Sequence, residues 1–212
     1  YYSLGYLCVM DVPDAFNRGE IACVKHAVRI PVIAVGRINS PELAEELLRD
    51  GTADFTAVGR GLLADPDFVN KITAKEPICR CLGCNQGCRA ATVRKKIRCM
   101  QNVRIGNEKA LTFAPPSPAL EAKKVVIVGA GPAGLEAAAM LAEHGVKNLV
   151  IFEQESRPGG KINLAQIPPF KANMEFLTGY RLEVLKRHGV DAFYRKFPGI
   201  PPSLESLCTF LC

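Results

Sequence analysis

The residues with the most evident chemistry are cysteines, and they are concentrated in one stretch of the sequence. The chain of 212 residues has nine cysteines, and five of them fall between Cys79 and Cys99. A dense local cluster, unlike the evenly spread cysteines of disulfide-stabilised secreted domains, indicates thiolate ligands in a reducing compartment. Four of the five follow the pattern C-x2-C-x3-C-x10-C: Cys81, Cys84, Cys88 and Cys99.

Four thiolates are the ligand set of a [4Fe–4S] cluster. A structural zinc ion bound by four cysteines is the alternative. The spacing favours iron and sulfur, because zinc ribbons usually present two C-x2-4-C pairs and here the last cysteine stands alone. Gly83 and Gly87 allow the backbone to curve around a cofactor and to present N–H groups to its sulfurs. Cys79 lies only two residues before Cys81 and is expected not to be a ligand.

A glycine-rich motif, GAGPAG at residues 129–134, is the second pattern. It follows the apolar run 123–128 and precedes an alanine-rich stretch that predicts a helix to about residue 145. The next predicted strand, 149–152, ends in an acidic residue, Glu153. Strand, glycine turn, helix, strand and acidic residue together form the dinucleotide-binding fingerprint.

Each position of this fingerprint has a physical role. Gly129 permits the tight turn, Gly131 lets the backbone approach a pyrophosphate, and Gly134 permits close packing of helix and strand. Glu153 lies 22 residues after Gly131 and can accept hydrogen bonds from an adenosine ribose. Gly160, in the glycine pair after it, offers a further backbone amide.

A repeated Gly-Arg dipeptide is the third pattern. The apolar runs 30–36 and 53–59 each end in glycine followed by arginine, giving Gly36-Arg37 and Gly59-Arg60. Phosphate often binds after strands seven and eight of a TIM barrel, where glycine exposes backbone N–H groups and arginine binds in a bidentate manner. Two ordinary strand ends are the alternative interpretation.

The elements that position these dipeptides form a β-α-β unit. Ser40 and Pro41 predict a helix start, with serine as N-cap and proline at the first helical position, and the helix ends near Gly51. A strand, a helix and a strand joined by short loops imply a parallel sheet.

The composition of the chain excludes several classes of protein. Hydrophobic residues make up 48% and charged residues 23%, which is ordinary for a globular protein and excludes disorder, collagen or coiled coil for the whole chain. The net charge of +6 is too small to imply nucleic acid, and an anionic cofactor or substrate explains it equally well.

The most apolar stretch, 125–142, contains three glycines, Pro132 and Glu136 and does not predict a membrane span. The N-terminus has no Met and no signal-peptide pattern, so we expect a fragment.

Three segments are expected from these patterns, and the overall class is α/β. Residues 1–74 form the last two β/α units of a TIM barrel, and residues 75–113 form the cluster segment. A proline-rich linker at 114–122 leads to the first part of a Rossmann-like domain at 123–212, in which 191–212 no longer follow the pattern.

The three motifs together resemble one family. IPVIAVGRI and AVGRGLLADPDFVNK resemble the end of the FMN-binding barrel of the old yellow enzyme family. CLGCNQGC with the later cysteine resembles the cluster segment of the 2,4-dienoyl-CoA reductase, enoate reductase and trimethylamine dehydrogenase group, and GAGPAGLEAA with the later PGG resembles the FAD-binding half of flavoprotein reductases. The resemblance spans about 28–190 and excludes the first 18 residues. Arg80 and Val103 stand where this group leads us to expect proline.

The resemblance implies a role for each candidate residue. It implies an FMN phosphate site at Gly36, Arg37, Gly59 and Arg60. It implies [4Fe–4S] ligation by Cys81, Cys84, Cys88 and Cys99. It implies FAD contacts at Gly129, Gly131, Gly134, Glu153 and Gly160.

The reaction that the resemblance implies is a relay. NAD(P)H reduces FAD, single electrons pass through the cluster to FMN, and FMN reduces the C=C bond of an enoate or 2,4-dienoyl-CoA type of substrate. The catalytic residues are expected upstream of Tyr1. We expect a cytoplasmic protein, homo-oligomeric at full length, with a small-molecule substrate and no nucleic-acid or membrane partner. An amine dehydrogenase of the trimethylamine type and an inactive fragment or electron-transfer module are the alternatives.

Overall fold

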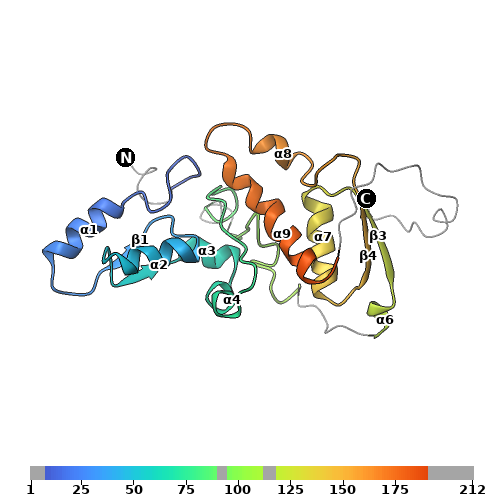
Figure 1. Ribbon diagram of the computed structural model, residues 1–212, viewed down its shortest axis with the longest axis horizontal. Helices are drawn as coiled ribbons and strands as arrows, with labels where there is room; N and C mark the ends of the chain where they lie inside the picture. Colours follow the sequence, from blue (N-terminus) through green and yellow to red (C-terminus); the bar gives the residue numbers. More distant parts are fainter. Residues whose placement is uncertain (1–7, 90–94, 112–117, 191–212) are drawn as a thin grey trace. The chain divides into compact units, whose positions relative to one another are not determined.

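The computed structural model describes residues 8–89, 95–111 and 118–190 (Figure 1). The chain divides into two compact units. The first unit comprises residues 1–112 and 165–180, and the second comprises residues 113–164 and 181–212. Over the described ranges, no helix combines the length and the apolar character needed to cross a membrane.

The first unit begins with the β-α-β arrangement that the sequence predicts. After helix α1 (Arg18–Ala27), strand β1 (Ile33–Val35), helix α2 (Pro41–Arg49) and strand β2 (Phe55–Ala57) follow in order. The two strands pair in parallel, with Ile33 opposite Phe55. The Ser40 hydroxyl accepts a hydrogen bond of 3.3 Å from the Leu43 N–H, which confirms the predicted N-cap.

One face of this short sheet is covered and the other is not. Ala34 packs against Leu47 of α2 in a small buried cluster with Ala15, Ile38 and Ala53. Because side chains alternate along a strand, the neighbours of Ala34 point the other way. Ile33 and Phe55 are 60% and 57% exposed, an unusual state for apolar residues of parallel strands.

Two short helices lead from the sheet into the cysteine segment. Helix α3 (Gly59–Ala64) begins directly after β2, and α4 (Phe68–Ala74) follows it. In the described residues of 75–111 the chain forms turns and irregular structure, with no helix or strand. This segment belongs to the same compact unit as β1 and β2.

The second unit contains another parallel β-α-β arrangement. Strand β3 (Lys124–Val128), helix α7 (Pro132–Glu143) and strand β4 (Asn148–Phe152) form it, with Val125 opposite Leu149. Its core contains Leu135 and Ala138 of α7 together with Leu149 and Ile151 of β4. The predicted strand, helix and strand of this region are thereby confirmed.

The remaining elements are short except for the last helix. Helix α8 (Ile162–Ala165), a 3-10 turn (Ala172–Met174) and helix α9 (Glu175–Arg187) follow β4. Within the second unit, Arg181 of α9 is 2% exposed and donates through Nε to Oε2 of Glu136 at 2.5 Å.

Part of the expected linker has a regular structure. Residues 118–121 form helix α6 (Pro118–Glu121), because proline is well accommodated at the first position of a helix. Residues 114–117 of that linker, residues 191–212 of the off-pattern end and residues 1–7 lie outside the described residues.

Candidate functional site

The two Gly-Arg dipeptides line one cavity of about 330 Å³ in the first unit. The cavity wall combines residues 35–39 at and after the end of β1 with residues 57 and 59–61 at and after the end of β2. It is completed by Cys81 and Gly83 of the cysteine segment and by Cys8, Phe16 and Asn17. The structure therefore brings together all four residues predicted for a phosphate site, namely Gly36, Arg37, Gly59 and Arg60.

The two arginines of this cavity are in different states. Arg37 donates through Nε to Oδ1 of Asp14 at 3.0 Å and through Nη1 to the Val9 carbonyl at 2.9 Å, and its Nη2 lies 2.8 Å from the same Asp14 oxygen. All three of its nitrogens are engaged. Arg60 uses only Nη1, which donates to the Cys8 carbonyl at 2.7 Å and to Oδ1 of Asn85 at 2.5 Å. Its Nε and Nη2 have no partner within the described part of the chain and can donate to a ligand.

Asn39 on the cavity wall has a hydrogen-bond partner for its side-chain nitrogen but, within the described residues, none for its side-chain oxygen. Asn39 is 4% exposed, and its Nδ2 donates to the Cys81 carbonyl at 3.2 Å. Its buried Oδ1 has no hydrogen-bond partner among the described residues. Buried polar atoms without partners are rare in native structures, so this oxygen is suited to accept a hydroxyl or amide proton from a molecule in the cavity. A phosphate ester that carries hydroxyl groups meets both the Arg60 donors and this acceptor.

A second, smaller hollow is lined by the four predicted thiols. Cys81, Cys84, Cys88 and Cys99 border it, with Arg60 and Asn85 among their neighbours. Gly87 lies so close to the Arg98 carbonyl that a Cβ at this position would overlap the oxygen. This close backbone approach brings the stretch that ends at Cys88 against the stretch that leads to Cys99.

Burial and mutual proximity govern the electrostatics of these thiols. Burial raises the pKa of the Cys81 thiol, the Gly83 N–H and the Arg60 charge act in the lowering direction, and Cys99 and Cys84 raise it further. Burial also raises the pKa of Cys84, to which the nearby Cys99 and Cys88 contribute. The Gly83 N–H donates to Cys81 Sγ at 3.4 Å, as the sequence predicts for a glycine in this turn. Thiols that are half-buried, close together and met by N–H donors suit an iron–sulfur cluster.

Cys79 has a separate environment. It is buried, its N–H donates to Oδ2 of Asp65 at 2.8 Å, and its sulfur lies 3.9 Å from the Gln101 carbonyl. It does not border the hollow of the other four cysteines. Among residues 8–89, 95–111 and 118–190, no three His, Cys, Asp or Glu side chains are placed to hold one metal ion together. The ligands of a cubane do not need to meet at one point, because each thiolate binds a different iron.

The glycine motif of the second unit forms an open turn at the end of β3. Gly129 has a φ of +97°, and Gly134 lies against the Gly129 carbonyl so closely that any side chain would overlap it. A Cβ at Gly131 would meet no heavy atom within 4 Å, so the space in front of this residue is available to a ligand. The turn is therefore tightly packed where Gly134 meets the Gly129 carbonyl. It is open at Gly131, the residue that precedes α7.

The acidic residue and the glycine pair both contact this turn. Glu153 is buried, and its Oε2 accepts a hydrogen bond of 2.7 Å from the Ala130 N–H. Its Oε1 accepts one of 3.0 Å from the Glu155 N–H. The Gly159 N–H donates to the Ala130 carbonyl at 2.8 Å, and a Cβ on Gly160 would lie 3.2 Å from the Gly131 Cα. The predicted ribose and pyrophosphate contacts thus lie around one loop.

Sequence reasoning missed several polar residues of the first unit. Asp14, Asn39, Asp65 and Asn85 each make a hydrogen bond to a residue far away in the sequence. Asn39 lies two residues after the Gly36-Arg37 dipeptide, and that position was a usable signal. Asp65 and Asn85 lie within the stretches AVGRGLLADPDFVNK and CLGCNQGC, but the resemblance assigned no role to them. Asp14 lies within the first 18 residues, to which the sequence assigned no role.

Two family profiles match parts of the chain that contain the Gly-Arg dipeptides and the glycine motif. A profile of the NADH:flavin oxidoreductase / NADH oxidase family matches residues 12–78, and a profile of the NAD(P)-binding Rossmann-like domain matches residues 127–193. The expectation that the resemblance excludes the first 18 residues is thus wrong for residues 12–18. These residues flank α1, and Asn17 there donates to the Val35 carbonyl at 2.8 Å.

Among curated relatives, the chain is 42% identical over 182 residues to a bilirubin reductase of Mediterraneibacter gnavus, a match that covers 84% of this chain and 28% of that protein. It is 34% identical over 171 residues to a cinnamate reductase of Clostridium sporogenes, with 79% of this chain and 25% of that protein covered. The chain therefore spans about a quarter of the length of these relatives.

Solved structures agree with this placement. A 2-naphthoyl-CoA reductase complex superposes with a TM-score of 0.83 at 27% identity, over 95% of this chain and 31% of that one. A 6-hydroxypseudooxynicotine amine oxidase from Pseudomonas geniculata N1 gives a TM-score of 0.81 at 30% identity, over 90% of this chain and 29% of that one. The chain belongs to the NADH:flavin oxidoreductase family, in the old yellow enzyme and 2,4-dienoyl-CoA reductase group.

Proposed function

We propose that the complete protein to which this sequence belongs uses NAD(P)H to reduce an activated C=C bond of an enoate or enoyl-CoA type of substrate. The observation that carries the proposal lies in the first unit, where a phosphate-type cavity and a four-cysteine hollow share a wall. Arg60 and Cys81 border both. Side-by-side sites for a flavin phosphate and an iron–sulfur cluster support electron exchange between the two groups.

The cavity is proposed to hold the phosphate and ribityl chain of FMN. Gly59, where a Cβ would meet no heavy atom within 4 Å, leaves room for the phosphate, and the Nε and Nη2 donors of Arg60 can bind it. The unpartnered Oδ1 of Asn39 can accept a hydrogen bond from a ribityl hydroxyl. Arg37, whose nitrogens are engaged by Asp14 and Val9, is proposed to support the loop and contribute mainly its backbone.

The four cysteines are proposed to hold a [4Fe–4S] cluster, and the second unit is proposed to hold FAD. The cluster supplies one-electron transfer between two flavins that each accept two electrons. Gly131 and the N-terminus of α7 face the space for the FAD pyrophosphate. Glu153 can accept ribose hydroxyls in addition to its two backbone donors, since a carboxylate offers about four acceptor positions.

The test is direct and uses the complete protein. Purified anaerobically, it should contain FMN, FAD and about four irons with four sulfides per chain, by the stoichiometry of a cubane. It should oxidise NAD(P)H only when an enoate such as cinnamate or an enoyl-CoA is present. Stoichiometric zinc without acid-labile sulfide would contradict the cluster assignment. Because thiolate ligands persist in a reducing compartment, we propose that the protein is cytoplasmic.

A second function is favoured by one specific comparison. The 6-hydroxypseudooxynicotine amine oxidase superposes on the chain nearly as well as the 2-naphthoyl-CoA reductase does. An amine dehydrogenase would use the same cofactor sites and pass electrons outward instead of receiving them from NAD(P)H. Cofactor reduction by a methylated amine in the absence of NAD(P)H, without enoate reduction, would identify this function.

A further inference from the structure

Arg60 is placed to act on both sites of the first unit. It stands at the start of α3, directly after β2, and borders both the cavity and the cysteine hollow. Its two hydrogen bonds go to neutral acceptors, the Cys8 carbonyl at 2.7 Å and Asn85 Oδ1 at 2.5 Å. Within the described residues, no carboxylate forms an ion pair with it. Among the described residues, the positive charge of Arg60 is therefore not paired with a carboxylate, and it lies next to the cysteines.

Asn85 fixes the position of that charge. It lies in the turn between Cys84 and Cys88, is buried, and has a left-handed backbone with a φ of 55°. Its side chain accepts the Arg60 hydrogen bond from inside the cysteine turn. The turn and the guanidinium therefore hold each other in place.

Comparison with Arg37 shows that the surroundings of Arg60, more than its residue type, distinguish it. Arg37 follows β1 as Arg60 follows β2, but Asp14 neutralises its charge at 2.8 Å. It borders the cavity and does not border the cysteine hollow. Of these two arginines, only Arg60 lacks a carboxylate partner among the described residues, and it borders the hollow of the four cysteines.

We propose that Arg60, held by Asn85, raises the reduction potential of the cluster bound by the four cysteines. On reduction the cluster gains one electron from a reduced flavin, and its charge becomes more negative by one unit. A nearby cation in a half-buried site stabilises that added charge. The inference rests on the proposed function, because it requires Cys81, Cys84, Cys88 and Cys99 to hold the cluster.

The experiment is a redox titration of the complete protein, followed by the electron paramagnetic resonance signal of the reduced cluster. Arg60→Gln should lower the ratio of reduced to oxidised cluster at a fixed potential about tenfold, which is 59 mV for one electron. Arg60→Lys keeps the charge and should restore most of the potential. Asn85→Gly, which glycine tolerates at this φ, should shift the potential in the same direction by a smaller amount, because Arg60 is then no longer held in place.

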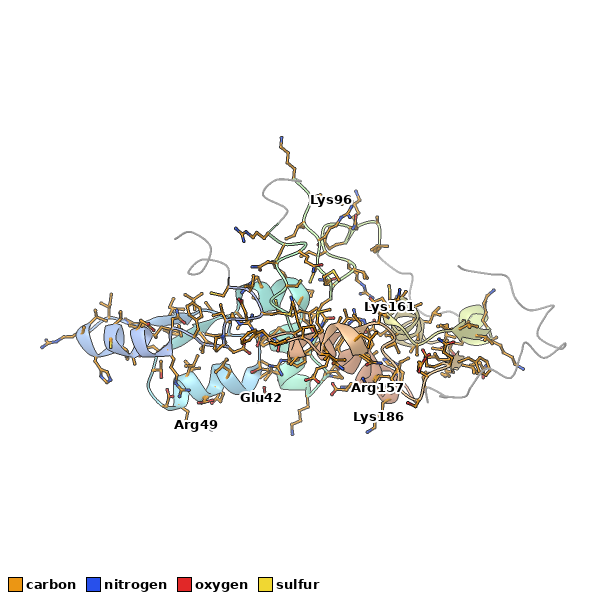
Figure 2. The ribbon with its side chains drawn as sticks, turned by 90° about the horizontal axis from the view of Figure 1, so that it is seen from above. Glu42, Arg49, Lys96, Arg157, Lys161 and Lys186 are labelled. Atoms are coloured by element: carbon orange, nitrogen blue, oxygen red, sulfur yellow. The ribbon has the colours of Figure 1, made fainter. Side chains whose placement is uncertain are left out.

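Arg49→Gln is the matched control. Arg49 is an exposed cation that projects from the end of α2 (Figure 2), so its loss removes one charge from the same unit without affecting either site. Its potential should equal that of the unmodified protein. A shift of the same size in Arg49→Gln would overturn a specific role for Arg60.

Iron, sulfide and FMN contents are measured on every variant before the titration. An unmodified protein without iron and sulfide refutes the proposed function itself. A loaded Arg60→Gln protein with an unchanged potential refutes only the role of Arg60. If Arg60→Gln does not load, Arg60→Lys and Asn85→Gly decide: an unshifted Asn85→Gly, or an Arg60→Lys shifted as far as Asn85→Gly, overturns the inference.

Discussion

The two units use the same local arrangement in different ways. In each, a parallel strand, a helix and a second parallel strand follow one another, and glycine ends the first strand. In the second unit the proposed FAD contacts are mostly backbone atoms around the loop after β3, together with the Glu153 carboxylate. In the first unit the candidate site is assembled from segments far apart in the sequence, joined through side chains such as Asn39 and Arg60. Backbone turns of this kind have a sequence motif, whereas the long-range side-chain contacts that join the first site have none.

Glycine also has different partners in the two units. Gly134 lies against the carbonyl of another glycine, and Gly131 faces open space. In the first unit, Gly36 and Gly83 lie against side chains instead, those of Asn17 and Arg37. Gly131 therefore leaves space in front of the backbone, whereas Gly36 and Gly83 make room for polar side chains of the protein itself.

The largest expected effect applies to both units at once. Expressed alone, the 212-residue chain should show no NAD(P)H-dependent reduction of an enoate and should aggregate. Each sheet has two strands in the described residues, and Ile33, Val35 and Phe55 leave an apolar face exposed. Size-exclusion chromatography and an assay with cinnamate check this. Enoate reduction by the purified 212-residue chain would contradict this prediction, because it would show that the chain needs no further part of the complete protein for activity.

The next prediction isolates the second unit. Gly131→Val in the complete protein should abolish retention of FAD, because two methyl groups would occupy the open space that a pyrophosphate needs. FMN and iron should remain bound, since their proposed residues lie in the first unit. Flavin and iron analysis of the purified variant measures this. Retention of FAD with loss of FMN would reverse the assignment of the two flavins to the two units.

A milder variant of the same loop provides the comparison. Glu153→Ala removes a carboxylate whose oxygens accept from Ala130 and Glu155 at 2.7 and 3.0 Å. FAD binding should weaken by about 1.5–3 kcal/mol, the usual contribution of hydrogen bonds to a charged group. The dissociation constant of FAD, measured by fluorescence, should therefore rise without loss of the cofactor at high concentration.

The cysteine pair Cys84 and Cys79 tests the first unit. Cys84→Ser removes a thiol that borders the common hollow and should lower iron and sulfide to well below the level of the unmodified protein. Cys79→Ser should leave both unchanged, because its sulfur faces the Gln101 carbonyl. Colorimetric iron and sulfide assays suffice. Equal losses of iron and sulfide in the two variants would contradict the assignment of the ligands from their position around the hollow.

The smallest effect concerns the ion pair between Lys71 and Asp65, whose carboxylate also accepts a hydrogen bond from the Cys79 N–H. Lys71 Nζ lies 2.8 Å from Asp65 Oδ2; burial lowers the pKa of Lys71, but Asp65 and Tyr180 outweigh it and keep that pKa above its ordinary 10.5. The stabilisation is therefore complete below pH 10.5 and is lost as the pH rises through the raised pKa. The difference in thermal midpoint between the unmodified protein and Lys71→Met should hold from pH 7 to about 10 and then shrink. We expect on the order of 1 kcal/mol, as for partly exposed ion pairs.

Much of this fold could be predicted from the sequence because its signals are local. Ser40 caps α2, the apolar runs become β1 to β4, and the glycine turn precedes α7, each as predicted from neighbouring residues. The strands of the first unit are shorter than their apolar runs, since only Ile33–Val35 and Phe55–Ala57 find a partner. Helix α1 carries no strong pattern, and none of its residues is buried.

The candidate site could be predicted only in part. The two Gly-Arg dipeptides are equivalent in the sequence, and the difference between Arg37 and Arg60 depends on Asp14 and Asn85. Those partners lie 23 and 25 residues away from their arginines, so no periodicity or motif connects them. The roles of the cysteines, the glycines and Glu153 in binding cofactors remain predictions.

The contacts of Asp65, Asn39 and Asn102 have a consequence for how the protein matures. Asp65 binds the Cys79 N–H, Asn39 binds the Cys81 carbonyl, and Asn102 donates to the Leu63 carbonyl at 3.0 Å. None of these contacts uses a ligand thiol. In zinc fingers the metal itself drives folding. Here the cysteine segment is held by hydrogen bonds that involve Asp65, Asn39 and Leu63, so we expect the polypeptide to fold before it receives the proposed cluster.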